Sequence, residues 1–95
     1  IDTGVSGEVA IKMGQIMRRL SKNLQVMSIT HLPQIASLGN NHYFVYKDQL
    51  QNETITIMKL LSNEERVVEI AKMLSGEKPT AGALENAKEL LLNKV

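Results

Sequence analysis

Apolar residues recur at steps of three and four from Gly7 to about Asn23, and charged or amide side chains fill most positions between them. This is the period of an amphipathic helix, so we predict a helix over this range. Ser6 lies just before it and suits the N-cap, since a serine hydroxyl can accept a hydrogen bond from an amide of the first turn. The apolar positions are Val9, Met13, Ile16, Met17 and Leu20.

The next apolar stretch, residues 24–30, is short and partly β-branched, which predicts a strand covered on both faces. A helix followed by such a strand is half of a β-α-β unit, whose first strand would precede Ile1. We therefore expect the chain to be a segment cut from a larger domain.

His31 follows the predicted strand directly, and Leu32-Pro33 then turns the chain into a short helix over residues 32–37, because proline suits the first turn of a helix. In open parallel sheets, ligands bind beyond the carboxyl ends of strands, which makes His31 a candidate functional residue. The alternative is a histidine that caps the helix or packs against it.

Two later stretches, 42–47 and 53–60, alternate apolar and polar residues and predict an antiparallel hairpin with residues 48–52 as its connector. Two helices then follow. Ser62 and Glu65 have the form of a capping box that begins the first, which Gly76 ends, and the second is predicted over 81–94. The fold class is therefore α/β, with the order α-β-α-β-β-α-α and a small mixed sheet.

Composition narrows the class of protein. Ninety-five residues suffice for one small domain or a piece of a larger one, and 43% of them are apolar, which is unlike a disordered tail. Eleven basic and ten acidic residues leave a net charge of +1, so no overall attraction to nucleic acid is encoded. The absence of cysteine excludes disulfides and thiolate metal sites. No apolar run approaches the ~20 residues that span a bilayer.

Common catalytic motifs are missing from the sequence. It contains no phosphate-binding loop, no GxGxxG, no HExxH and no nucleophile elbow. His31 and His42 have no cysteine or acidic cluster near them, so we expect no metal site. The basic group Arg18, Arg19 and Lys22 is interpreted as a solvated helix face rather than a phosphate-binding surface.

Three stretches, in this order and spacing, resemble the carboxyl-terminal end of RecN-type DNA repair ATPases, which are bacterial relatives of the SMC proteins with an ABC-type ATP-binding head. They are DTGVSG at 2–7, ITHLPQIA at 29–36 and IAKMLSG at 70–76, and the closing helix is also similar. The resemblance covers essentially the whole chain. It implies a partial P-loop NTPase fold, in which residues 1–7 are the D-loop, 8–31 lead to the switch histidine, 42–60 form a hairpin and 62–95 form the terminal helices.

The resemblance also implies roles for individual residues. Asp2, Gly4 and Ser6 lie in the D-loop, which crosses the dimer interface and contacts the partner head's nucleotide site. Ser6 stands where SMC relatives usually have Asp, so N-capping is its safer role. His31 corresponds to the switch histidine, a catalytic residue that reaches the γ-phosphate or the attacking water, since an imidazole can donate to a phosphate oxygen. Gln34, one turn further on, is given no role.

The same resemblance implies ATP and Mg²⁺ as ligands of the intact protein, a second head as its homodimeric partner, and DNA as its target in recombinational repair of double-strand breaks. The location implied is the bacterial cytoplasm, beside the nucleoid. The phosphate loop, the Mg²⁺-binding Asp and the catalytic Glu have no counterpart in these 95 residues, so we expect the chain alone to bind no ATP and to be inactive. We also expect it to self-associate through residues 24–30 and the first helix, and to have no membrane partner.

Two alternatives remain open. The chain could be part of another ABC-type ATPase, such as a transporter, which would share the order of loop, helix, strand and histidine. It could also be a complete, non-enzymatic interaction domain, which would be a monomer without exposed apolar surface.

Overall fold

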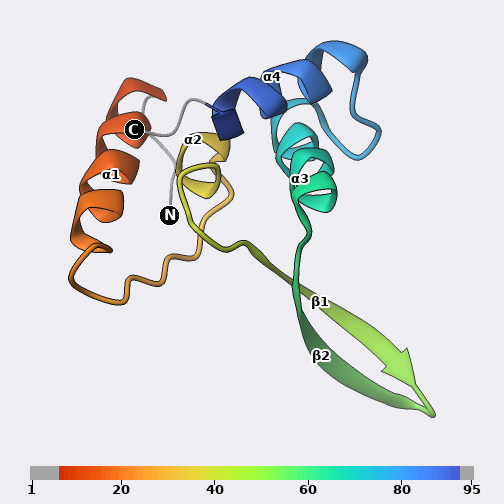
Figure 1. Cartoon of the computed structure of the whole chain (residues 1–95). Helices are drawn as coiled ribbons and strands as arrows, with labels where there is room; N and C mark the ends of the chain where they lie inside the picture. The colour runs from red at the N-terminus through yellow and green to blue at the C-terminus, as the bar shows by residue number, and fades with distance from the viewer. Residues whose placement is uncertain (1–6, 93–95) are drawn as a thin grey trace.

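Four helices gather into one group, and a β-hairpin projects from it, in the computed structural model of the chain, which describes residues 7–92 (Figure 1). The predicted N-cap Ser6 lies outside these residues. None of the described helices is both long and apolar enough to cross a membrane. In chain order, the elements are α1 (Gly7–Leu20), α2 (Pro33–Ala36), β1 (Tyr43–Leu50), β2 (Glu53–Leu60), α3 (Asn63–Ser75) and α4 (Ala81–Leu92).

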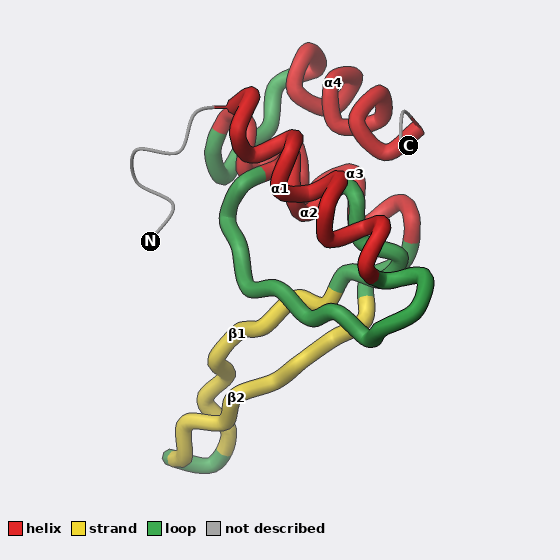
Figure 2. Tube along the Cα trace, turned by 90° about the vertical axis from the view of Figure 1, so that its left-hand side faces the viewer, coloured by secondary structure: helices red, strands yellow, loops and turns green. Residues whose placement is uncertain are grey.

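The predicted hairpin is confirmed. Strands β1 and β2 pair antiparallel, with Tyr43 opposite Leu60 and Leu50 opposite Glu53. The turn is shorter than the predicted connector. It consists of Gln51 and Asn52 alone, because β1 continues to Leu50 and β2 begins at Glu53. Both turn residues have positive φ, 50° and 66°, as a two-residue type I′ turn requires. Figures 1 and 2 show the hairpin extending away from the helices, and most of its side chains are exposed.

Helices α3 and α4 form the buried core. Ile70 and Ala71 of α3 pack with Ala83 and Ala87 of α4, and the small alanine side chains let the two helices approach closely. The short helix α2 lies against both.

The predicted capping box of α3 is also confirmed. Ser62 Oγ accepts a hydrogen bond from the amide of Glu65 (3.2 Å), and Glu65 Oε1 accepts one from the amide of Ser62 (2.9 Å). Gly76 follows the helix with φ 104°, a conformation that favours glycine. Helix α4 has a cap that the pattern did not reveal, since Thr80 Oγ1 accepts from the amide of Ala83 (3.0 Å).

The predicted strand over residues 24–30 is wrong for this structure. The described residues contain one sheet, with the strand order β1-β2, so the predicted mixed sheet is replaced by an antiparallel pair. Residues 25–32 instead form an extended loop without regular structure. A strand is held by hydrogen bonds to a neighbouring strand, and none of the described residues supplies one here. The coarse class, a small α/β fold with the order α-α-β-β-α-α, stands.

Helix α1 ends at Leu20 rather than near Asn23, and it packs through a different face from the one that the pattern indicated. Ala10 and Gly14 are its buried residues. The predicted apolar face is largely exposed, with Val9, Met13, Ile16 and Leu20 each between 42% and 48% exposed.

Candidate functional site

His31 lies at the end of the loop that joins α1 to α2, and its side chain is exposed. Thr30 Oγ1 accepts a hydrogen bond from the amide of Leu32 (3.0 Å), which links the residues on either side of His31. Leu32 is the extended N-cap residue of α2 and makes no side-chain cap, while Pro33 occupies the first helical turn. The predicted helix after His31 is therefore confirmed. Because α2 begins two residues after His31, its position determines the position of the histidine.

Gly7, the first residue of α1, lies beside α2. A Cβ atom on Gly7 would be 3.5 Å from Gln34 Nε2, so the beginning of α1 and the first turn of α2 are in contact. Gln34 Oε1 is buried and has no hydrogen-bond partner among residues 7–92. No pattern in the sequence singled out Gln34, yet its amide lies where the helix that follows residues 2–6 meets the helix that follows His31.

The close approach of α1 to α2 depends on Gly14. A Cβ atom at this position would be 2.5 Å from Leu38 Cδ1 and 3.3 Å from the carbonyl oxygen of Gln34. A larger residue at this position would therefore require the Leu38 side chain to move and the carbonyl of Gln34 to shift by a few tenths of an ångström. Figure 2 shows α1 running across α2 in this arrangement.

Arg66 of α3 is buried, with 4% of its surface exposed, and holds the end of α2. Burial, and then the positive charge of Arg18, lower the pKa of Arg66. No ion pair with a carboxylate is found for Arg66 among the described residues. Its Nη2 instead donates to the carbonyl oxygens of Ala36 (3.0 Å), Ser37 (3.4 Å) and Gly39 (2.6 Å).

Arg18 of α1 contacts the same turn from the other side. Its Nη1 donates to the carbonyl oxygen of Leu38 (2.8 Å) and to Asn40 Oδ1 (3.3 Å). The interpretation of Arg18 as part of a solvated face is thus wrong, because the side chain is partly buried and bound to backbone. The interpretation as a solvated residue remains valid for Arg19, which is exposed. The basic pattern on α1 does not distinguish the two.

The remaining predicted site residues, Asp2, Gly4 and Ser6, lie outside the described residues. Within residues 7–92, no group of three or more histidine, cysteine or acidic side chains could hold a metal ion. His42 is half-buried, and its Nδ1 has no hydrogen-bond partner in the part of the chain that the structure describes. Burial is the main reason that the pKa of His42 is lowered, and the positive charge of Arg66 adds to this effect.

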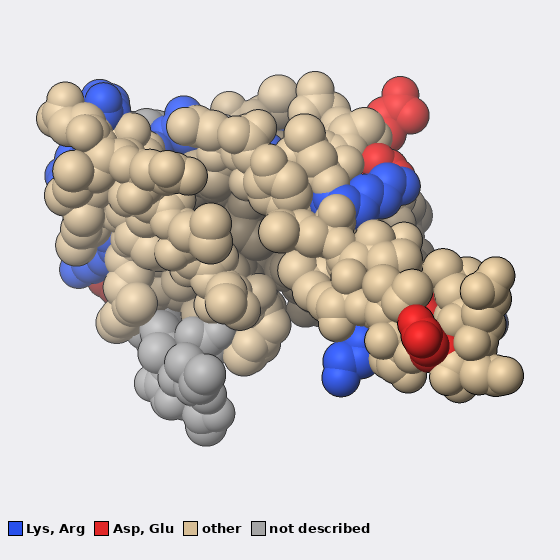
Figure 3. All heavy atoms as spheres, turned by 90° about the horizontal axis from the view of Figure 1, so that it is seen from below, with Lys and Arg blue, Asp and Glu red and all other residues tan. Residues whose placement is uncertain are grey.

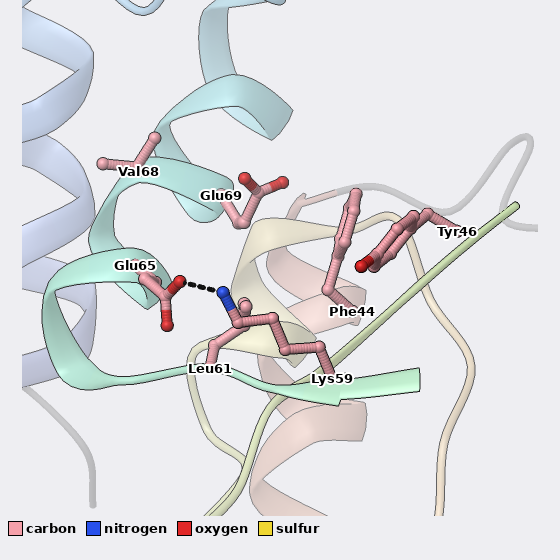
Figure 4. A pocket seen from close by; sticks show the side chains of 7 residues that line it. All are labelled: Phe44, Tyr46, Lys59, Leu61, Glu65, Val68 and Glu69. Atoms are coloured by element: carbon pink, nitrogen blue, oxygen red, sulfur yellow. Dashed lines mark hydrogen bonds and ion pairs between the residues drawn. The ribbon is translucent and has the colours of Figure 1, made fainter. Parts of the chain in front are cut away.

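A shallow hollow lies between the hairpin and α3, with a volume of about 410 Å³ (Figure 4). Phe44 and Tyr46 stack on one side of it, with ring centroids 5.6 Å apart. Glu65 accepts a hydrogen bond from Lys59, and this bond together with the Ser62 amide lowers the pKa of Glu65 to about 2. Glu69 pairs with Lys72 at 3.2 Å. Phe44, Leu61 and Val68 make the lining of the hollow mainly apolar, and both carboxylates are paired with lysines.

Searches among known proteins identify relatives of the chain. No protein-family model matches it. The DNA repair protein RecN of Vibrio cholerae serotype O1 is 41% identical over 92 residues, which cover 97% of this chain and 17% of that protein. RecN of Rickettsia bellii is 44% identical over 95 residues, covering all of this chain and 17% of that protein. RecN of Bacillus subtilis is 41% identical over 91 residues, covering 96% of this chain and 16% of that protein.

The chain thus spans about one sixth of the length of the curated relatives that it matches. The similarity extends over nearly all of its residues and includes the three stretches quoted above. The resemblance found in the sequence is confirmed, and the chain belongs to the RecN family of DNA repair proteins.

Proposed function

We propose that this chain supplies the D-loop, residues 2–7, and the switch histidine, His31, to the ATP site of an SMC-like head in a RecN protein. The intact protein would bind and hydrolyse ATP, pair two heads around it and act in recombinational repair of DNA double-strand breaks in the bacterial cytoplasm. The relatives carry the name DNA repair protein, which supports the general role.

The observation that carries the proposal is the contact between Gly7 and Gln34. Gly7 ends the proposed D-loop, and Gln34 lies three residues after His31. Their contact therefore brings the end of the proposed D-loop close to the helix that follows His31. An exposed imidazole at the beginning of α2 can donate a proton or a hydrogen bond to a phosphate oxygen. These are the contributions expected of a residue that detects the γ-phosphate.

Mg²⁺ and the rest of the triphosphate need other parts of the protein. The described residues provide no metal-binding cluster. We assign Mg²⁺ ligation and cradling of the phosphates to segments outside this chain. The 95 residues alone are accordingly proposed to be inactive toward ATP.

The alternative of a self-contained interaction domain is disfavoured by the surface. Met27 is 83% exposed and Ile29 is 97% exposed, and the apolar face of α1 is largely exposed as well. The face of the molecule in Figure 3 is mostly free of charged side chains, which lie chiefly at its margins. Exposed apolar side chains such as Met27 and Ile29 are typical of a contact site, so we propose that they are covered by other parts of the intact protein and that the isolated chain self-associates through them.

The test is ATP hydrolysis by a full-length RecN protein that carries this sequence. We expect His31→Ala to lower kcat on the order of 100-fold, the effect of removing one hydrogen-bond donor to a charged transition state, while ATP still binds. Ser28→Ala is the matched control, since Ser28 is an exposed residue of the same loop. Unchanged turnover by His31→Ala would contradict the proposed role.

A further inference from the structure

We propose that Arg66 is a positioning residue for His31: its guanidinium fixes the end of α2 and, through α2, the direction in which the histidine leaves the helical group. This inference rests on the proposed function, because it assumes that His31 acts on the nucleotide. Arg66 itself touches no part of the proposed site. It belongs to α3, 27 to 30 positions along the chain from the carbonyl groups that it binds.

Packing alone does not explain a buried arginine. Burying a guanidinium is costly unless it is paired, and here the partners are neutral carbonyl oxygens rather than a carboxylate. Arg66 Nε is also buried, and none of the described residues forms a hydrogen bond with it. An apolar side chain of similar length would fill the space without this cost. The arginine instead supplies hydrogen bonds at a defined point, because its Nη2 contacts the carbonyl oxygens of Ala36, Ser37 and Gly39 together.

The connection from Arg66 to His31 is short. Ala36, whose carbonyl oxygen accepts from Arg66, donates its own amide hydrogen bond to the carbonyl oxygen of Leu32 (3.0 Å). Leu32 follows His31 directly, and its amide donates to Thr30 Oγ1 (3.0 Å). One turn of helix therefore separates the residue that Arg66 holds from the backbone next to the histidine.

The opposite side of the turn is held as well. Arg18 donates to Leu38, so the carbonyl groups from Ala36 to Gly39 all accept hydrogen bonds from two arginines on different helices. The two cations lie close enough for Arg18 to lower the pKa of Arg66. Such an arrangement fixes α2 against both α1 and α3. A displacement of even 1 Å at a reacting group can lower a rate by up to about 100-fold.

The experiment measures ATP hydrolysis by the full-length RecN protein that carries this sequence, with kcat expressed per nucleotide-binding site. Arg66→Met keeps an unbranched apolar side chain, shorter than that of arginine, and removes the donors, and Arg66→Lys keeps the charge but replaces the guanidinium by an ammonium group on a shorter side chain. Arg19→Met is the matched control, since Arg19 is exposed on α1. Expressing kcat per site that binds ATP removes the effect of any molecules that fail to fold.

We expect Arg66→Met to lower kcat between about 10-fold and 100-fold, with KM for ATP changed less than about twofold. Arg66→Lys should retain an intermediate rate, and Arg19→Met the full rate. In a His31→Ala background, Arg66→Met should cause little further loss, because two residues that act through one group are not additive.

Two results would overturn the inference while leaving the proposed function intact. One is a wild-type kcat per binding site in Arg66→Met, which would make Arg66 purely structural. The other is multiplication of the two losses in the double variant, which would make Arg66 independent of His31. A normal rate in His31→Ala alone would instead refute the proposed function, and the role of Arg66 with it.

Discussion

Ile70 and Ile29 both lie in apolar stretches of this chain, yet Ile70 is fully buried and Ile29 is 97% exposed. Ile70 is in α3, which packs on α4 and closes a small core. Ile29 is in the loop before α2, where none of the described residues covers it. The difference shows that an apolar pattern states only what must be buried, whereas burial itself depends on a partner surface.

The largest expected effect is on the free energy of unfolding, when Ile70 and Ile29 are each replaced by alanine in separate variants. Ile70→Ala should lower the free energy of unfolding by about 2–5 kcal/mol, since it removes buried methyl groups and leaves a cavity. Ile29→Ala should change it by less than about 0.5 kcal/mol, as for other exposed positions. Urea denaturation followed by circular dichroism at low protein concentration measures both. Equal losses would mean that the loop is buried after all.

Local signals account for the parts of the fold that were predicted correctly. The capping box at Ser62, the helix end at Gly76 and the alternation of the hairpin are all encoded within a few residues of the elements that they specify. The strand at 24–30 was predicted wrongly because its existence depends on a neighbouring strand, which no local pattern supplies. For the same reason, periodicity located the apolar face of α1 but not the face, around Gly14, through which it packs.

The residues of the candidate site also differ in whether local sequence reveals them. His31 and the helix after it could be located from the sequence, because Leu-Pro marks a helix start. Arg66 could not be found, since its partners lie 27 or more positions away and an arginine in an amphipathic helix is expected on the surface. The roles given to His31 and to residues 2–7 come from the family resemblance and stay predictions.

A second experiment tests whether the exposed apolar residues of the loop are buried when the isolated chain self-associates. Replacing Met27 and Ile29 together by serine should weaken association of the isolated chain. Each buried apolar side chain contributes about 1.5–3 kcal/mol, so the dissociation constant should rise by at least about tenfold. Sedimentation velocity across micromolar concentrations measures this change.

Met58→Ser is the matched control for that experiment, because Met58 is also exposed but lies on the hairpin. Its dissociation constant should stay near that of the unaltered chain. A monomeric wild-type chain, or weakening by Met58→Ser alone, would contradict association through residues 24–30.

The smallest expected effect is a pH dependence that originates at His42, between the hairpin and the buried helices. Burial, and then the positive charge of Arg66, lower its pKa from 6.5, and the carboxylate of Glu69 partly opposes this effect. The unfolded chain therefore takes up a proton at a higher pH than the folded chain. The stability contribution is complete above about pH 6.5 and is lost as the pH falls through 6.5 toward the lower, folded-state pKa.

Urea denaturation at pH 7.5 and at pH 5.5 should thus show a lower free energy of unfolding at the lower pH. Glu65 does not interfere in this window, since its pKa of about 2 makes its contribution fall only below about pH 4.5. His42→Gln should reduce the difference between the two pH values, because it removes the titrating group. A difference of the same size in this variant would mean that the pH dependence of stability originates in a group other than the half-buried ring of His42.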